Sequence, residues 1–438
     1  MQLKENSKVF ICAPENTVTG GPTLCHQLCS CLLAHGVDAY MTYYSRGEKQ
    51  RDPVANAYKK YLLPYTDEVE DDPDNVLIIP EVRPGFYQET RKIRQVMWWM
   101  SVDNYLARVA DHVHNLVWGN LAVQVPLKLV LGVLTRENNE KMNLEHWVQS
   151  QYAFDFLTCN GVPGEKISFV SDYLEPVYVN RIAEGYDNYR EDIVLYNPQK
   201  GARFTKLLME QAPDIHWVPI EKMTAVQVRD LLQRSKVYID FGNHPGKDRI
   251  PREAAACGCC IITGKRGAAA NDIDIAIPAA YKFADTEENI PAILAMIRKL
   301  LQNYSQHCDD YVSYRQKIKA EPSVFLAEVE QAFELSAPQQ VLGAAWWGDI
   351  AMGRALKDVF CPQSYRHFYI CDRDMDENEF YRCEEGMEYL SEQESLFLYQ
   401  EKRIHKFVTA ANDQISIERL QQGGVKCADI LVADVTRG

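Results

Sequence analysis

The segment from Val237 to Gly264 reads VYIDFGNHPGKDRIPREAAACGCCIITG, and it decides the predicted fold. An apolar strand ends at Asp240, a loop rich in glycine and charge follows, and a helix begins near Pro251. A second apolar strand covers Cys260 to Thr263. In open α/β sheets, ligands bind beyond the carboxyl ends of the strands. The segment therefore predicts a buried parallel strand, a binding loop and a helix that starts at the ligand.

The charges in this loop indicate what it binds. Lys247, Arg249 and Arg252 place three cations beside a helix N-terminus, whose free N–H groups favour phosphate. Arg clamps phosphate bidentately and Lys offers a point charge. Glu253, in the first turn, is suited to the hydroxyls of a sugar or a ribose instead. The alternative is that these cations only pair with Asp248 and Glu253 to cap the helix.

Short apolar runs separated by helical segments occur on both sides of this stretch, which is typical of a parallel sheet covered on both faces. The predicted strands are Lys8–Cys12, Asp38–Thr42, Asn75–Pro80, Gln95–Met100, Ile193–Tyr196, Trp217–Pro219 and Val237–Phe241. The predicted helices are Leu24–Ala34, Arg203–Gln211 and Thr224–Gln233. The pattern restarts after about Asp187, so we expect two doubly wound α/β units, with no residue-level repeat between them. Successive helices follow, and RHFYICD and ADILVADV then predict strands of a further small α/β segment.

Composition bounds the class of protein. The chain has 438 residues, of which 46% are hydrophobic and 25% charged, and 47 basic against 61 acidic residues give a net charge of −14. Such an acidic chain is not expected to bind nucleic acid. The 13 Cys are too few for a disulfide scaffold, so we expect free thiols in a cytoplasmic protein.

The segment VYIDFGNHPGKDRIPREAAACGCCIITG resembles the donor-binding motif of GT-B fold glycosyltransferases, the sugar-nucleotide-dependent group that includes many retaining bacterial polysaccharide enzymes. Their motif has two Glu separated by seven residues, and Glu253 followed by AAACGCCIIT matches the second, which typically binds the ribose. The first would fall at Pro245, so this chain departs from the motif there. The resemblance implies a carboxylate contact to the donor sugar, for which His244 or Asp248 is the expected replacement.

Two further segments are similar to the same family. LYNPQKGARFTK places Lys200 where the family has a basic residue on the donor diphosphate, with Arg203 or Lys206 beside it. TVTGGPT places Gly20 and Gly21 in the glycine-rich loop that approaches the donor phosphate from the N-terminal domain. Taken alone, each of these is also typical of an ordinary turn.

The resemblance implies two Rossmann-like domains that face each other across a cleft. We expect an acceptor-side domain over residues 1–185, a donor domain with closing helices over 186–335, and an additional α/β segment of unknown role over 336–438. Residues 8–335 carry the resemblance, and the last hundred residues lie outside it.

Asp103 is the predicted acceptor-side catalytic residue, because it follows an apolar strand whose end should face the cleft, and a structural helix cap is the alternative. His244 is the second predicted catalytic residue. Ser171, Asp172 and Tyr173 are weaker candidates. The tryptophans Trp98 and Trp99 are expected in the core.

No metal is expected. The strings NDID at 271–274 and DRDMD at 372–376 look like metal motifs, but that motif belongs to a different transferase architecture, and polar loops are the better interpretation. The cysteines Cys257, Cys259 and Cys260 are expected to be buried apolar residues.

The resemblance implies a metal-independent, retaining glycosyltransferase that moves a sugar from a nucleotide-diphosphate sugar, its co-substrate, to a saccharide or lipid-linked acceptor. Two alternatives remain: a sugar-nucleotide epimerase or hydrolase, and a non-catalytic protein of the same fold. No spanning helix is expected. Leu116–Leu134, the most apolar stretch, predicts a buried element, with a shallow contact at the inner membrane face as the alternative.

Overall fold

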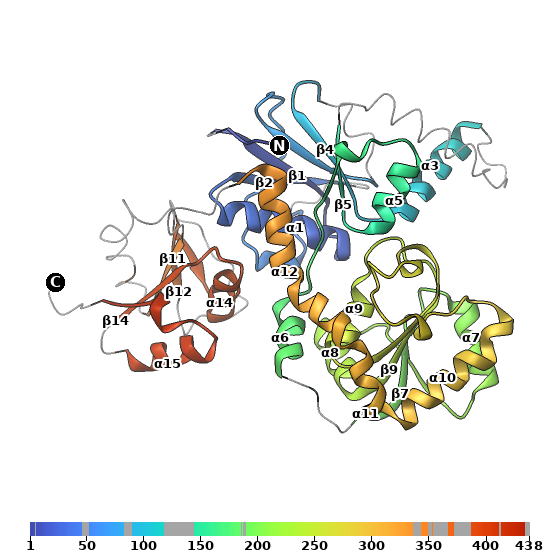
Figure 1. The fold of residues 1–438 in the computed structure, drawn as a ribbon. Coiled ribbons are helices and arrows are strands. Elements are labelled where there is room, and N and C mark those ends of the chain that lie inside the picture. Colours follow the sequence, from blue (N-terminus) through green and yellow to red (C-terminus); the bar gives the residue numbers. More distant parts are fainter. Residues whose placement is uncertain are drawn as a thin grey trace. The chain divides into compact units, whose positions relative to one another are not determined.

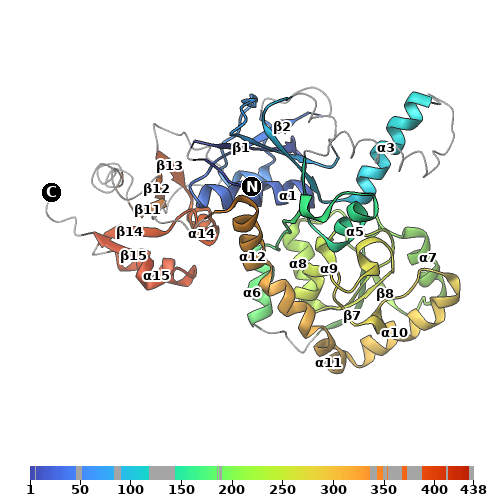
Figure 2. The same ribbon diagram turned by 45° about the horizontal axis from the view of Figure 1, so that its top comes forward.

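The computed structural model consists of three parallel β-sheets with helices packed on them (Figures 1 and 2). The chain divides into two compact units, Met1–Leu77 with Phe333–Gly438, and Ile78–Ala332. The structure describes residues 1–4, 6–45, 52–82, 90–117, 144–184, 186, 190–335, 343–348, 353, 367–371, 387–410 and 413–433.

The first sheet has the strand order β2-β1-β3-β4-β5-β6. Its elements are β1 (Lys8–Pro14), α1 (Gly20–Ala34), β2 (Asp38–Tyr44), α2 (Asn56–Lys59), β3 (Val76–Pro80), β4 (Arg94–Trp99), α3 (Val102–Val117), β5 (Glu145–Val148), α5 (Gln151–Cys159), η2 (Gly164–Lys166) and β6 (Ile167–Phe169). Trp98 and Trp99 of β4 are fully buried, as expected, and the indole N–H of Trp99 donates to His146 of β5 at 3.0 Å. The aromatic residues of β4 therefore build the core.

The second sheet has the order β10-β9-β7-β8, and every pairing in it is parallel. Its elements are α6 (Pro176–Glu184), β7 (Glu191–Tyr196), α7 (Ala202–Gln211), β8 (His216–Pro219), α8 (Ala225–Arg234), β9 (Ser235–Asp240), α9 (Arg249–Ala256) and β10 (Cys260–Thr263). Helices cover both of its faces (Figure 1). Thr224, the first residue of the helix predicted over 224–233, is the N-cap of α8 within a complete capping box. Short helices and then long ones follow: η3 (Gly267–Ala270), η4 (Ala279–Tyr281), η5 (Glu287–Asn289), α10 (Ile290–Gln302), α11 (Tyr304–His307), η6 (Cys308–Tyr311) and α12 (Val312–Phe333).

The third sheet has the order β13-β12-β11-β14-β15 and is also parallel. It is made of β11 (Gly343–Trp347), β12 (His367–Cys371), β13 (Met387–Leu390), α14 (Glu392–Gln400), β14 (Lys406–Ala410), α15 (Gln414–Gln422), η7 (Cys427–Asp429) and β15 (Ile430–Ala433). The strands predicted at RHFYICD and ADILVADV are present. The DRDMD string lies outside the described residues.

One module occurs twice in the chain. The run β5-α5-η2-β6 and the run β14-α15-η7-β15 share the pattern L-x3-G-V-x4-I, at Leu157 and at Leu420. The glycines in the two copies, Gly161 and Gly424, have φ angles of 87° and 86°. In both copies the valine that follows the glycine donates its N–H to the leucine carbonyl. Val162 donates to Leu157 at 3.1 Å, and Val425 donates to Leu420 at 2.9 Å. The same local sequence thus ends the helix in the same way in two different sheets.

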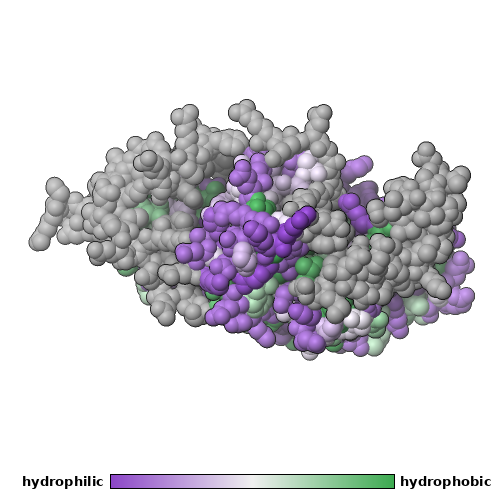
Figure 3. Space-filling view, turned by 90° about the horizontal axis from the view of Figure 1, so that it is seen from above, coloured by the Kyte–Doolittle hydropathy of each residue, from purple (hydrophilic) through white to green (hydrophobic). Residues whose placement is uncertain are grey.

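The predicted α/β class with parallel sheets is confirmed. The predicted domain limits at 185 and 335 lie between the three sheets and stay predictions, as does the cleft between domains. No helix among the described residues is long and apolar enough to cross a membrane. On the face shown in Figure 3, the described residues are mostly hydrophilic, with separate hydrophobic spots. Most of Leu116–Leu134 lies outside the described residues, so the predicted membrane contact stays a prediction.

Replacing Gly201 by Ala is expected to destabilise the second sheet. Gly201 has a φ of 58°, and a Cβ there would lie 1.4 Å from the carbonyl oxygen of Phe241. The backbone must therefore move, and we expect the free energy of unfolding to fall by about 3 kcal/mol or more. Gly164→Ala is the matched control, since no atom lies within 4 Å of its Cβ position. Equal midpoints of the two variants in urea unfolding would contradict this expectation.

Candidate functional site

Two loops meet at the carboxyl ends of β7 and β9, which are neighbours in the sheet. One loop carries Lys200 and Gly201 before α7, and the other runs from Phe241 to Asp248 before α9. A Cβ on Gly242 would lie 2.7 Å from the nitrogen of Gly201, so both glycines are needed for the two backbones to touch. Residues 48 positions apart in the sequence, Lys200 and Asp248, are thereby brought into contact.

The loop after β9 is also held from its other side. The N–H of Val102 donates to the carbonyl of Pro245 at 2.9 Å, and a Cβ on Gly246 would lie 2.1 Å from the carbonyl oxygen of Met100. Pro245, which stands where the similar family has its first Glu, thus makes a backbone contact with the start of α3. Behind the loop, Ala268 donates its N–H to the carbonyl of His244 at 2.9 Å. The loop is therefore fixed by backbone contacts along its length.

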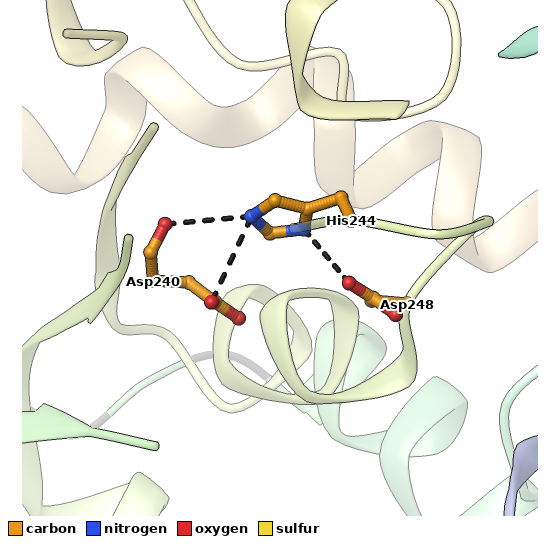
Figure 4. Close-up of side chains that lie close together, drawn as sticks. All are labelled: Asp240, His244 and Asp248. Carbon is orange, nitrogen blue, oxygen red and sulfur yellow. Dashed lines mark hydrogen bonds and ion pairs between the residues drawn. The ribbon is translucent and has the colours of Figure 1, made fainter. Parts of the chain in front are cut away.

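A cluster of alternating charge lies inside this loop (Figure 4). The imidazole of His244 is fully buried, with Nδ1 2.8 Å from Oδ2 of Asp248 and Nε2 3.7 Å from Oδ1 of Asp240. Tyr238 donates its hydroxyl to Asp240 at 2.8 Å. Lys200 donates to Oδ2 of Asp248, which is also the oxygen that His244 approaches. The row Asp240, His244, Asp248, Lys200 therefore alternates acid and base.

Burial and pairing act against each other in this row. Burial alone would lower the pKa of His244, but the bond to Asp248 and the charge of Asp240 outweigh it and raise the pKa. Burial raises the pKa of Asp240 above its ordinary value. Burial would also raise the pKa of Asp248, yet the contacts with His244 and Lys200 lower it. His244 therefore lies between two carboxylates that favour its protonated form, an arrangement suited to fixing the loop.

Three side chains of this row also carry atoms that can bind a metal ion. Asp240, His244 and Asp248 offer ligand atoms that lie within 4.8 Å of one another. The two carboxylates, however, approach different nitrogens of the imidazole ring, each as an ion-pair partner (Figure 4). Asp248 also forms an ion pair with the ammonium group of Lys200. The arrangement fits an ion-pair row better than a metal centre.

Arg252 lies in a second, fully buried network. Its guanidinium donates to Asp172 at 2.7 Å and to Glu321 of α12 at 2.8 Å. It also donates to the carbonyls of Asp248 and Lys247, at 3.1 and 3.0 Å. The carboxylates of Asp172 and Glu321 help to raise the pKa of Arg252 against the effect of burial. This guanidinium is occupied by the protein, so the geometry favours a role in positioning the loop over direct contact with the donor.

The remaining charges at the start of α9 are less fully paired. Lys247, in the loop before the helix, pairs with Glu321 at 2.8 Å. Arg249 lies 3.6 Å from Asp172 and 3.7 Å from Glu253, and its buried Nη1 has no hydrogen-bond partner among the described residues. The side chain of Glu253 is 14% exposed, and burial raises its pKa. Arg249 and Glu253 thus keep hydrogen-bonding capacity for a ligand.

The other predicted site residues are more scattered. Asp103, in the first turn of α3, accepts the hydroxyl of Tyr152 at 2.9 Å. Arg203 is exposed on the first turn of α7. Gly20 and Gly21 open α1 in the other compact unit. For these residues, contact with the donor or the acceptor stays a prediction.

The structure accounts for the acidic string at 271–274. Asp274 accepts the N–H groups of Gln151 and Tyr152, at 2.8 and 2.9 Å, and so caps α5. Asp272 pairs with Lys282 at 3.0 Å. These carboxylates therefore have structural partners. The cysteines Cys257, Cys259 and Cys260 are buried, as expected.

Sequence reasoning missed two residues of this region. Glu321 lies 69 positions from its partner Arg252, and no local pattern in α12 signals the contact. Glu81, directly after β3, carries a buried carboxyl group. The only sign of it in the sequence is that a charged residue follows the apolar run NVLIIP.

Arg252→Ala is expected to be strongly destabilising. It leaves Asp172 and Glu321 buried without their main cation, which costs about 3–5 kcal/mol in the free energy of unfolding. Arg298→Ala is the control, because Arg298 pairs with Asp214 at the surface and such pairs contribute about 0–1 kcal/mol. Chemical unfolding compares the two variants, and similar losses in both would show that the buried network does not support the fold.

Comparison with known proteins gives distant structural likenesses. No protein-family model matches the chain, and no curated protein matches it in sequence. Among solved structures, HepE of Anabaena in complex with UDP-glucose is 10% identical, with a TM-score of 0.49. Sucrose-phosphate synthase of Thermosynechococcus elongatus is 12% identical and the lipopolysaccharide outer core galactosyltransferase WaaB 11%, both with TM-scores of 0.48. Each likeness covers 74% of this chain and 98% of the other. All three TM-scores are below 0.5, so the functional argument rests on the residues.

Proposed function

We propose that the chain is a GT-B type glycosyltransferase that takes its sugar from a nucleotide-diphosphate sugar. The observation that carries the proposal is the convergence of Lys200 with Asp248, Arg249 and Glu253 at the carboxyl ends of β7 and β9. Ligands of parallel α/β sheets bind at this edge. A cation, a helix N-terminus and a carboxylate in one place suit a diphosphate next to a ribose.

In the proposed binding mode, the donor diphosphate competes with Asp248 for the ammonium group of Lys200. Asp248 keeps a partner when Lys200 leaves, because His244 lies 2.8 Å away. Arg249 turns its Nη1, which makes no hydrogen bond within the described part of the chain, toward phosphate oxygen, and Glu253 accepts hydroxyl groups of the ribose. His244 fixes the loop, and Arg252 holds α9 in position through its buried carboxylates.

The transfer step follows from where charge develops. As the bond from the sugar to the diphosphate breaks, negative charge grows on the leaving phosphate, and Lys200, Arg249 and the N–H groups at the start of α9 stabilise it. An acceptor hydroxyl attacks the anomeric carbon, and Asp103 is the proposed group that orients it. We further propose retention of configuration, a saccharide or lipid-linked acceptor in polysaccharide or glycoconjugate synthesis, and a cytoplasmic location at the membrane face.

The rival with a specific observation in its favour is a non-catalytic protein of the same fold. Pro245 replaces a family carboxylate, and the Arg252 guanidinium is fully engaged within the protein. Such a protein binds the donor but transfers no sugar to any acceptor. An epimerase or hydrolase differs from both, because it turns over the donor with no acceptor present.

Thermal unfolding in the presence of nucleotide-diphosphate sugars tests donor binding. A ligand at 100 times its Kd stabilises the folded state by about 2.7 kcal/mol, so one donor should raise the Tm of the native protein. The rise should be lost in Lys200→Ala and Glu253→Ala. It should persist in Arg298→Ala, whose guanidinium pairs with Asp214 at the surface. A rise of equal size in all variants would refute the assigned roles.

Metal independence is tested with the same donor. Because Lys200, Arg249 and the helix N-terminus supply the positive charge, the rise in Tm is expected to be equal, within error, with excess EDTA and with added Mg²⁺. Loss of the rise in EDTA, restored by Mg²⁺, would show instead that a divalent cation bridges the diphosphate.

A further inference from the structure

An amide side chain without a hydrogen bond lies at the carboxyl end of β5. Gln149 directly follows this strand and is 7% exposed. Its backbone N–H donates to the carbonyl of Trp99 at 3.1 Å, which fixes the residue beside the end of β4. Its side chain makes no hydrogen bond within the described part of the chain. A polar group largely withdrawn from water is unfavourable without a partner, so this amide is suited to receive one from a ligand.

The side chain of Gln149 faces the loop between β9 and α9. Its Oε1 lies 3.1 Å from the position that a Cβ on Gly246 would take. That position is also 2.1 Å from the carbonyl oxygen of Met100, so a side chain at residue 246 would not fit. The amide of Gln149 therefore lies beside the backbone of the donor loop, with no side chain between them.

The order of groups along a nucleotide-diphosphate sugar brings the sugar to this part of the loop. In the proposed binding mode, the ribose lies at Glu253, one turn inside α9, and the diphosphate at Arg249, the first residue of the helix. The sugar is attached to the far phosphate, so it extends from Arg249 toward the loop before the helix, where Gly246 lies. Pro245, next to Gly246, has no hydrogen-bonding side chain. A polar group from another element is therefore needed to bind the sugar there.

We propose that Gln149 is a specificity-determining residue for the transferred sugar, whose hydroxyl group hydrogen-bonds with the Gln149 amide beside Gly246. This inference rests on the proposed function and deepens it. A carboxamide has two donors and one acceptor, and a sugar hydroxyl both donates and accepts, so the two groups match in either direction. The amide is also neutral, so it binds the hydroxyl without placing a negative charge next to the diphosphate.

The test compares the native chain with Gln149→Met, which keeps an unbranched side chain of similar length and removes the amide. Gln151→Met is the matched control, because the amide of Gln151 donates to Asp155 at 2.7 Å on the exposed side of α5. Calorimetry measures the affinity for UDP, GDP and ADP and for their esters with glucose, galactose, mannose and N-acetylglucosamine. For each nucleotide, the affinity of the sugar ester divided by that of the free diphosphate gives the contribution of the sugar.

Gln149→Met is expected to lower this ratio about tenfold for the sugar ester that the native chain binds, since a sugar hydroxyl then lies against an apolar group. Affinity for the free diphosphate should be the same in all three proteins, which also shows that the variants are folded with the loop in place. Gln151→Met should keep the native ratio. An unchanged ratio in Gln149→Met would overturn the proposal.

Deoxy analogues of the bound donor separate a direct contact from an indirect effect on the loop. Each analogue lacks one hydroxyl group of the sugar. If the amide binds a hydroxyl, one analogue binds the native chain about tenfold more weakly than the full donor, yet binds Gln149→Met as well as the full donor does. A residue that only supports the loop would show the same losses for every analogue in both proteins, and this pattern counts against a sugar contact.

The free diphosphates distinguish failure of this inference from failure of the proposed function. If neither the diphosphates nor their sugar esters bind the native chain, the proposed function fails and the role of Gln149 fails with it. If a diphosphate binds and the sugar contributes equally in the native chain and in Gln149→Met, the donor site stands and Gln149 does not recognise the sugar.

Discussion

The site depends on one buried cation. Arg252 connects α9 to Asp172, in the segment after β6, and to Glu321 of α12. Because a buried guanidinium without carboxylates would be very unfavourable, these three elements can pack only together. The same guanidinium holds the carbonyls of Lys247 and Asp248, so it also sets the path of the loop before α9. The network supports the loop before α9 and the less completely paired residues Arg249 and Glu253.

The ion-pair row of Asp240, His244, Asp248 and Lys200 is the other charged network of the site. Neighbouring charges in the row have opposite signs. In the proposed binding mode, the donor diphosphate takes the place of Asp248 beside Lys200, and His244 remains beside Asp248. Binding of this kind exchanges one ion pair for another, which keeps the desolvation cost low.

Many of the strands and helices were predictable from local sequence, whereas the side-chain networks of the site depend on contacts between residues far apart in the sequence. The strands around β7, β9 and β10 and the N-cap Thr224 follow from apolar runs and capping chemistry, which act over a few residues. The proximity of Lys200 to Asp248 was predictable only as far as parallel strands end at one edge. The partners Asp172 and Glu321, which change the expected role of Arg252, lie 80 and 69 positions away from it. Glu81 was missed because its significance lies in its burial, which the polar residue alone does not reveal.

The module that occurs in both β5-α5-η2-β6 and β14-α15-η7-β15 is a turn specified by its own local sequence. Its left-handed glycine and the bond back to the leucine carbonyl lie within a dozen residues. The outer faces of the two helices differ: the hydroxyl of Tyr152 of α5 donates to Asp103, while Ile415 in the same place on α15 is 61% exposed. A helix that ends in this turn can therefore present different side chains to its surroundings without any change in the way the chain continues to the next strand.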